Sequence, residues 1–286
     1  MSDVTSEISI EMKDTFGVNY VQVLNISVFN GGEVNIQLPE VVVCASEIFV
    51  DAKIRCSDGV MALILVKNAL DNAVGKDIKV TLKLGYLPYA RQDRICNKGE
   101  ALSIQAFVGL INMLQFNEVM ILDPHSEVGP ALFTAKLSVT TQEQMLSESI
   151  RNFDLRLGAD VITLVSPDAG ATKKTEQVSK HYNGLPVIQA TKKRDLKTGQ
   201  LSGFGFYGDV KGKDLLIVDD ICDGGGTFVG LAKILKEAGA GEIGLYVSHG
   251  IFSRGVDNLL ENGIDYIITT DSFFEGYHKD VEVVKY

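Results

Sequence analysis

The feature that most constrains the fold of this chain is an alternation of apolar runs with amphipathic segments, repeated along most of the sequence. The apolar runs have the length of β-strands, and the segments between them repeat apolar residues at helical spacing. Residues 100–115 and 227–238, for example, each place their apolar side chains on one helical face. Strands that are separated by helices form βαβ units, so the pattern predicts an α/β fold with mostly parallel sheets.

The helix over residues 227–238 also carries both of its end signals, Thr227 at its start and Gly239 after it. The full set of predicted elements follows from the same periodicities. Strands are predicted at 78–84, 118–122, 161–165, 186–190, 214–218, 242–248 and 264–269, and helices at 100–115, 142–151, 170–182 and 227–238.

The N-terminal part of the chain has a different pattern. Residues 21–29 and 34–39 look like strands, and Asn30, Gly31 and Gly32 between them favour a tight turn, so a hairpin is predicted. A length of 286 residues suits two average domains. The best candidate for the boundary between the two domains lies near residues 134–140.

Composition and charge exclude several classes of protein. A formal net charge of −10 argues against a general nucleic-acid binder, which needs a basic face to neutralise phosphates. No apolar run reaches the roughly 18 residues of a membrane-spanning helix, and the acidic N-terminus does not resemble a signal peptide. The four cysteines form no CxxC pair, so no disulfide or zinc framework is expected. We therefore expect a cytoplasmic protein without nucleic-acid or membrane partners.

Polar clusters follow four of the predicted strands at the point where each strand ends. They occupy residues 89–94, 123–126, 166–170 and 219–227. In open α/β sheets, ligands bind beyond the carboxyl ends of the strands. The four clusters together predict one cleft that holds both cations and acidic groups.

The cluster at 219–227 is the most specific of the four. Asp219 and Asp220 would lie at the tip of a buried strand, where carboxylates accept hydrogen bonds from sugar hydroxyls or reach a metal through water. The three glycines that follow bring backbone N–H groups to a helix N-terminus, which binds phosphate. A plain glycine turn, capped by Asp223 or Thr227, is the alternative. The adjacent carboxylates favour a functional site, because they repel each other and need partners.

The other clusters each have a structural alternative. The polar residues at 91–94 commonly form surface ion pairs, although Tyr-Leu-Pro-Tyr at 86–89 indicates a packed loop. His125 is either a satisfied histidine near the core or a metal ligand beside carboxylates. Asp168 follows a proline and is either a turn residue or part of the site.

A polar segment at 191–211 begins with Lys192, Lys193 and Arg194. It is either a solvated loop or a mobile lid that brings cations to a phosphate chain in the transition state. Two look-alike motifs lie in and beside it. Residues 203–208 match GxGxxG but neither follow a predicted strand nor open a helix, and 208–213 resemble a Walker loop with one residue too few. Neither is taken as a nucleotide-binding motif.

These clusters together resemble one family, the ribose-phosphate pyrophosphokinases, also called phosphoribosyl-pyrophosphate (PRPP) synthetases. Residues 217–227 (IVDDICDGGGT) are similar to the family's PRPP-binding motif, and 88–94 (PYARQDR) to its ATP-site segment. DPHS at 123–126 resembles its metal segment, and SPDAG at 166–170 matches its Ser-Pro-Asp-x-Gly segment. KKR at 192–194 stands where its flexible catalytic loop begins. The segments occur in the family's order and span most of the chain.

The resemblance implies two phosphoribosyltransferase-like α/β domains, each a mostly parallel sheet flanked by helices. Residues 1–137 would form the ATP side, and residues 138–286 the ribose 5-phosphate side with the PRPP loop. The implied enzyme is a ribose-phosphate diphosphokinase of nucleotide biosynthesis. It would transfer the β,γ-diphosphoryl group of ATP to the anomeric hydroxyl of ribose 5-phosphate, giving PRPP and AMP, with Mg²⁺ as cofactor.

The resemblance also implies a role for each polar cluster, in a reaction that depends on positioning and charge neutralisation. The implied roles are ribose 5-phosphate binding by Asp219, Asp220, Asp223, Gly224, Gly225, Gly226 and Thr227; nucleotide binding by Phe29, Glu33, Arg91, Gln92 and Asp93; metal binding by His125 and Asp168; and catalysis by Lys192, Arg194 and His125.

Two positions depart from the family's pattern. The family's adenine segment Phe-Ser-Asp-Gly-Glu reads Phe-Asn-Gly-Gly-Glu at 29–33, so Gly31 removes one purine contact, and Gly224 stands where Thr is usual. In the family, that adenine segment is donated by a neighbouring subunit. The resemblance therefore implies a homo-oligomer, at least a dimer, with a hexamer as the larger option.

Two other functions stay open on the sequence alone. A phosphoribosyltransferase that uses PRPP as its substrate would explain residues 217–227 but not 88–94, and such enzymes usually need only one domain. A non-catalytic regulatory relative would be expected to lose the lid cations or the metal histidine. Lys192, Arg194 and His125 are all present, which favours the active enzyme.

Overall fold

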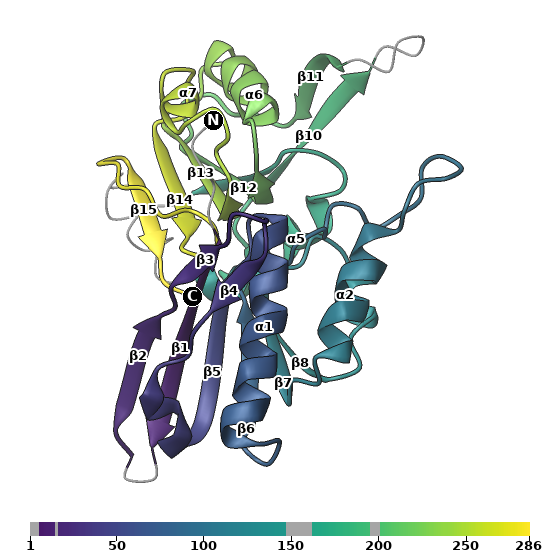
Figure 1. The fold of residues 1–286 in the computed structure, drawn as a ribbon. Helices are drawn as coiled ribbons and strands as arrows, with labels where there is room; N and C mark the ends of the chain where they lie inside the picture. The colour runs from purple at the N-terminus through teal and green to yellow at the C-terminus, as the bar shows by residue number, and fades with distance from the viewer. Residues whose placement is uncertain (1–5, 15–16, 147–161, 195–200) are drawn as a thin grey trace. The chain divides into compact units, whose positions relative to one another are not determined.

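A computed structural model describes residues 6–14, 17–146, 162–194 and 201–286, excluding the side chains of residues 41, 43, 192–194, 201 and 202. The chain forms two compact units, Met1–Thr140 and Thr141–Tyr286 (Figure 1). Each unit contains its own sheet and its own buried apolar core.

The first unit is built on a six-stranded sheet with the order β2-β1-β5-β6-β7-β8. Strands β5 to β8 run parallel, as the βαβ pattern predicts, whereas β1 pairs antiparallel with both β2 and β5. The strand bounds are Glu7–Asp14 (β1), Asn19–Val23 (β2), Ala45–Lys53 (β5), Lys79–Leu84 (β6), Glu118–Leu122 (β7) and Lys136–Thr140 (β8).

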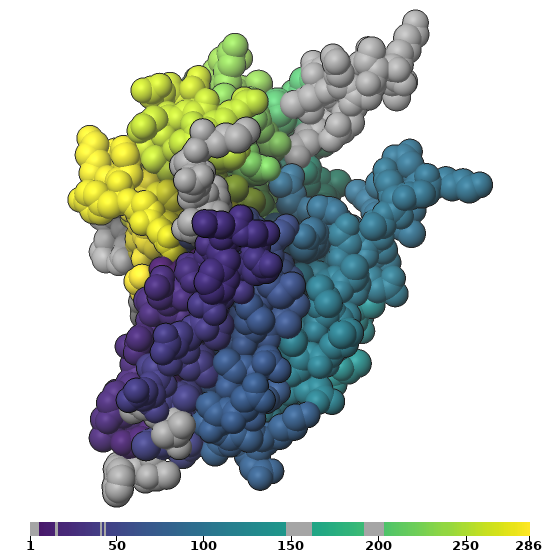
Figure 2. Space-filling view, viewed as in Figure 1, coloured from purple at the N-terminus to yellow at the C-terminus, as the bar shows by residue number. Residues whose placement is uncertain are grey.

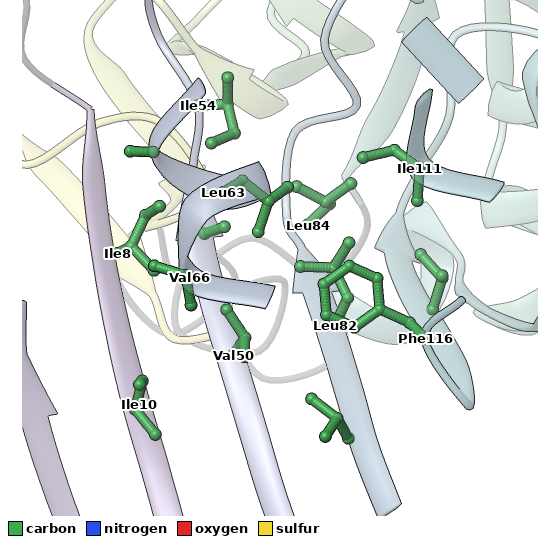
Figure 3. Packing of buried hydrophobic residues seen from close by; sticks show 14 of the residues in the cluster. Ile8, Ile10, Val50, Ile54, Leu63, Val66, Leu82, Leu84, Ile111 and Phe116 are labelled. Atoms are coloured by element: carbon green, nitrogen blue, oxygen red, sulfur yellow. The ribbon is translucent and has the colours of Figure 1, made fainter. Parts of the chain in front are cut away.

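Three helices connect the parallel strands of this sheet: α1 (Ser57–Val74), α2 (Ser103–Met113) and the single turn α3 (Val128–Ala131). A 3-10 turn, Glu40–Cys44, precedes β5. Figure 3 shows Leu63 and Val66 of α1 against Ile8 and Val50 of the strands, all fully buried. The sequence pattern predicted α2 but no helix at α1. The reason is that the buried face of α1 contains Gly59, Ala62 and Lys67 beside its large apolar residues, which weakens the periodicity.

The N-terminal hairpin forms, but the single strand predicted over residues 21–29 is wrong. The chain leaves β2 at Leu24, a buried residue whose N–H donates to the carbonyl of Ile8, and only then begins β3 (Ile26–Val28). β3 pairs antiparallel with β4 (Val34–Ile36), which α1 contacts. Burial of Leu24 thus divides the predicted strand between two sheets. In Figure 2 the purple N-terminal strands lie at the surface of the first unit, and every residue of the edge strand β2 is exposed.

The second unit has a seven-stranded sheet with the order β11-β10-β9-β12-β13-β14-β15. All neighbouring strands run parallel except β10 and β11. The strand bounds are Thr163–Ser166 (β9), Val187–Arg194 (β10), Leu201–Tyr207 (β11), Leu215–Cys222 (β12), Ile243–Gly250 (β13), Tyr266–Thr270 (β14) and Val281–Val284 (β15). The helices are α5 (Thr172–His181), α6 (Gly226–Glu237) and the single turn α7 (Asp257–Leu260).

Two predicted segments differ from the structure in this unit. The loop predicted over 191–211 is wrong for most of its described residues, because 191–194 belong to β10 and 201–207 to β11, which pair antiparallel. Residues 208–211 follow β11 without regular structure, and 195–200 lie outside the described residues. The strand predicted at 214–218 continues to Cys222, because β13 keeps pairing with it as far as Gly250. Of the helix predicted at 142–151, residues 142–146 are helical and the rest lies outside the described residues.

The predicted end of α6 is confirmed. Gly239 has a φ of +89°, and its N–H donates to the carbonyl of Lys236, which satisfies a terminal carbonyl of the helix. The predicted fold class, two α/β domains with mostly parallel sheets flanked by helices, agrees with the observed architecture. Among the described residues, no helix has the length and apolar character needed to span a bilayer.

Candidate functional site

The carboxyl end of β12 is an acidic site in the second unit. β9 pairs with β12 only as far as Ile217, so Asp219 and Asp220 extend past the end of β9. The carboxylate of Asp219 accepts a hydrogen bond from the backbone N–H of Asp220 at 2.9 Å. Asp220 is 7% exposed, and its carboxylate lies 3.6 Å from the ammonium of Lys174 in α5. The sheet and α5 therefore hold two neighbouring carboxylates with a cation beside one of them.

These carboxylates repel one another. Burial, followed by the negative charges of Asp220 and Asp168, raises the pKa of Asp219 well above its usual range. Asp168 thus lies within electrostatic reach of the β12 carboxylates, as the strand-end argument predicted. Oxygen ligands and excess negative charge suit a hard divalent cation such as Mg²⁺. In the described part of the chain, no three His, Cys, Asp or Glu side chains form a ready-made metal-binding group.

Asp168 also has the structural role that the alternative interpretation gave it. Its carboxylate accepts hydrogen bonds from the backbone N–H groups of Gly170 at 2.9 Å and Ala171 at 3.1 Å. Its carbonyl accepts one from the hydroxyl of Ser166 at 2.8 Å. These bonds fix the turn between β9 and α5, so the side chain that adds to the acidic field of Asp219 is held in place.

The segment from Asp223 to Thr227 leads from β12 into the first turn of α6, and the helix N-terminus has no side-chain cap. The capping role that the sequence left open for Asp223 or Thr227 is therefore wrong. Gly225 takes the N-cap position with a φ of +72°. The first N–H groups of a helix have no acceptor within the helix, and at the start of α6 no side chain serves as the acceptor. This arrangement can bind an anion through backbone donors.

A second segment holds this loop in position. The N–H groups of Ile251 and Phe252 donate to the carbonyl of Cys222 at 2.9 and 3.0 Å. The hydroxyl of Ser253 donates to the carboxylate of Asp223 at 2.7 Å, and the Ser253 N–H donates to the carbonyl of the same aspartate at 3.1 Å. The loop is therefore preorganised by the residues that follow β13.

Gly225→Ala should destabilise this loop. An added Cβ would lie 2.8 Å from Cδ2 of Leu259, and a φ of +72° is unfavourable for alanine. We expect the free energy of unfolding to fall by about 1–3 kcal/mol. A urea titration followed by circular dichroism measures the change.

Gly226→Ala is the matched control for that variant. An added Cβ at Gly226 meets no atom within 4 Å, and its φ lies outside the left-handed region. Its stability should stay within about 0.5 kcal/mol of the parent. Equal losses in the two variants would contradict the conformational explanation.

In the first unit, the predicted ATP-site segment is a packed loop after β6. Leu87 and Ala90 are buried, and the ring of Tyr89 lies 5.7 Å from that of Phe107. Tyr89 has a φ of +62°, and its carbonyl accepts the N–H of Gln92 at 2.9 Å. This anchored turn exposes Arg91 and Gln92 and leaves Asp93 half-buried.

His125 follows β7 and is exposed. Two residues earlier, the buried Asp123 has a φ of +35°, and its N–H donates to the carbonyl of Thr140 at 2.8 Å. The alternative of a satisfied core histidine does not describe His125, because its side chain is at the surface. His125 belongs to the first unit and Asp168 to the second.

Phe29 and Glu33 flank the turn of the β3–β4 hairpin. The Phe29 N–H donates to the carbonyl of Glu33 at 2.8 Å, and both residues are exposed, Phe29 by 62%. The hairpin therefore presents an aromatic ring and a carboxylate at its tip.

The backbones of Lys192 and Arg194 lie in β10, opposite Phe204 and Leu201 of β11. Their side chains lie outside what the structure describes. Sequence reasoning missed Lys174, which pairs with Asp220, and Gln142, whose amide donates to the carbonyl of Asp219 at 2.6 Å. Lys174 left one signal. It is in the first turn of α5, where the helix dipole disfavours a cation, so a charge partner could have been expected there.

Comparisons with known proteins identify the family of this chain. A model of the phosphoribosyl transferase domain matches residues 135–283, which include the end of β12 and the loop after it. The ribose-phosphate pyrophosphokinase of Mycoplasmopsis pulmonis is 30% identical to this chain over 253 residues, which cover 87% of this chain and 76% of that protein. The chain belongs to the ribose-phosphate pyrophosphokinase family.

Other ribose-phosphate pyrophosphokinases show the same extent of likeness. That of Vibrio parahaemolyticus is 28% identical over 253 residues, which cover 87% of this chain and 78% of that protein. A crystal structure of the phosphoribosylpyrophosphate synthetase of Mycobacterium smegmatis has a TM-score of 0.78 at 23% identity, covering 92% of this chain and 85% of that chain. The predicted family and fold class are therefore confirmed.

Proposed function

We propose that this chain is a ribose-phosphate diphosphokinase that transfers the β,γ-diphosphoryl group of ATP to the anomeric hydroxyl of ribose 5-phosphate. PRPP and AMP are the products. Family membership supports the activity. The observation that carries the site assignment is the pairing of an acidic strand end with an uncapped helix N-terminus at β12–α6. A sugar phosphate needs acceptors for its hydroxyls and donors for its phosphate, and this segment offers both.

Ribose 5-phosphate binds at this segment of the second unit. Asp219 and Asp220 accept hydrogen bonds from the ribose hydroxyls, which offsets the burial and the repulsion that raise the pKa of Asp219. Asp223, Gly224, Gly225, Gly226 and Thr227 surround the 5-phosphate, chiefly with backbone N–H groups. Lys174 and Ser253 act as positioning residues, because they hold Asp220 and Asp223 in place.

The nucleotide binds through residues of the first unit. Arg91, Gln92 and Asp93 contact ATP from the loop that Tyr89 anchors. Phe29, an exposed ring at a hairpin tip, stacks on the adenine, and Glu33 lies beside it. The hairpin serves the site of a neighbouring subunit, so the active form is a homo-oligomer, a dimer or a larger assembly such as a hexamer.

The charge on the transferred group is neutralised by cations. Lys192 and Arg194 supply positive charge to the diphosphoryl group as it moves, and such transfers depend mainly on positioning and charge. By the family resemblance, His125 and Asp168 would hold Mg²⁺, and the carboxylates near Asp168 fit a divalent cation by their charge. When bound, Mg²⁺ supplies further positive charge to the phosphate oxygens.

A phosphorus NMR time course with ATP, ribose 5-phosphate and Mg²⁺ tests the proposal. Equal amounts of AMP and PRPP are expected, and the same mixture without ribose 5-phosphate is the control. ADP in place of AMP would indicate transfer of a single phosphoryl group and would reject the proposal. Tight ATP binding without turnover would favour a regulatory relative, with Gly31 as the first position to examine.

A further inference from the structure

Arg254, which is not part of any of the family motifs, lies beside residues 223–227, the proposed phosphate loop. After β13 the chain turns at Phe252, whose carbonyl accepts the N–H of Gly255 at 2.8 Å. Arg254 is at the tip of this turn and is exposed. A Cβ built on Gly224 would lie 3.5 Å from Nε and 3.8 Å from Cδ of Arg254. The guanidinium end of Arg254 therefore lies against the phosphate loop at Gly224.

The position of Arg254 is held by its neighbour. Ser253 makes two hydrogen bonds to Asp223, one through its hydroxyl and one through its N–H. Asp223 belongs to the loop after β12, and Ser253 belongs to the turn that contains Arg254. The turn therefore cannot move away from the loop without breaking these bonds. Gly224 contributes by having no side chain that competes for the space next to Nε.

No carboxylate neutralises this guanidinium within the described residues. Asp223, the acidic residue of the loop itself, accepts a hydrogen bond from Ser253. Asp257, three residues after Arg254, lies 3.4 Å from the imidazole of His278. The guanidinium of Arg254 is therefore available to an anion that binds at the loop.

We propose that Arg254 binds the 5-phosphate of ribose 5-phosphate from the side of the loop opposite the helix, and so sets the preference of the site for a phosphorylated sugar. The inference rests on the proposed function, because it takes the loop as the 5-phosphate site. Guanidinium groups bind phosphate oxygens through paired N–H donors, and they complement the backbone donors at the start of α6. The group that Arg254 binds is a phosphate monoester dianion. No covalent bond to this phosphate is made or broken in the reaction.

Arg254→Ala in the full chain tests the proposal. Isothermal titration with ribose 5-phosphate alone should show a dissociation constant about tenfold to a hundredfold higher, the effect of losing a hydrogen bond to a charged group. The KM for ribose 5-phosphate should rise by the same factor. The kcat and the KM for ATP should stay within about twofold, because the 5-phosphate does not react.

Three comparisons make the test specific. Arg254→Lys keeps the charge without the paired donors and should lie between the parent and Arg254→Ala. Lys233→Ala removes the same charge from the exposed face of α6 and should bind ribose 5-phosphate like the parent. Ribose without its phosphate should interact equally with the parent and with Arg254→Ala.

An unchanged affinity for ribose 5-phosphate in Arg254→Ala would overturn the inference. A rise in the KM for ATP instead, or an equal loss in Lys233→Ala, would also overturn it. A failure of the proposed function can be distinguished from a failure of this inference. If the parent binds ribose 5-phosphate and Arg254→Ala binds it weakly, but the parent produces no AMP or PRPP, then the inference stands and the diphosphokinase assignment does not.

Discussion

Asp219→Asn should abolish most of the activity and yet stabilise the protein in the absence of ligands at neutral pH. Burial and the neighbouring carboxylates of Asp220 and Asp168 raise the pKa of Asp219, so its charged form is disfavoured in the folded state. Asparagine has no charge and keeps the oxygen that accepts the N–H of Asp220. We expect a melting temperature higher by about 2 °C or more.

The pH dependence of this effect has a definite sign. The folded protein binds the Asp219 proton more tightly than the unfolded chain does, so this group favours folding at low pH. Its contribution is present below the usual pKa of an aspartate and is lost as the pH rises through the raised pKa of Asp219. Thermal unfolding of the parent should therefore show a stability loss over that range, and Asp219→Asn should lack it.

The same variant should lose at least about a hundredfold in kcat/KM, because one charged acceptor for ribose and its cation is removed. AMP formation measures the loss. Asp77→Asn, a change of the same charge at an exposed position, is the control and should alter neither property. If Asp219→Asn left the activity intact, Asp219 would not belong to the substrate site. If it lowered the melting temperature, the assigned repulsion would be wrong.

Lys192→Ala should lower kcat by roughly a hundredfold or more while the affinity for ATP remains close to that of the parent. The physical reason is that a cation which meets the diphosphoryl group only during transfer stabilises the transition state and not the bound substrates. Turnover is measured by AMP formation, and the dissociation constant for ATP by isothermal titration. This result would also exclude a purely regulatory protein.

Lys193→Ala is the matched control for Lys192→Ala. The two residues occupy neighbouring positions of β10, opposite Gly203 and Phe204 of β11, and the two changes remove equal charge. We expect a much smaller loss of kcat in Lys193→Ala. Similar losses in both variants would indicate a general effect of positive charge, and an unchanged kcat in Lys192→Ala would remove Lys192 from the catalytic residues.

The sequence by itself determined the βαβ plan and the composition of the main site. The strand at β7 is predicted to the residue, and α6 stops just before Gly239 as expected, because periodicity and end signals act over a few neighbouring residues. The acidic pair and the three glycines after β12 are likewise local in sequence, so their chemistry could be recognised before any tertiary contact was known.

Only the tertiary structure decided which distant residues meet. Leu24 interrupts a predicted strand because the core of the first unit buries it, and β12 is longer than predicted because β13 lies beside it. Lys174 reaches Asp220, and Arg254 reaches Gly224, across many intervening residues. The raised pKa of Asp219 has the same origin. The charge of the adjacent Asp220 could be anticipated from the sequence, but burial and the carboxylate of Asp168 from another strand end act through space and are not encoded in the spacing of residues along the chain.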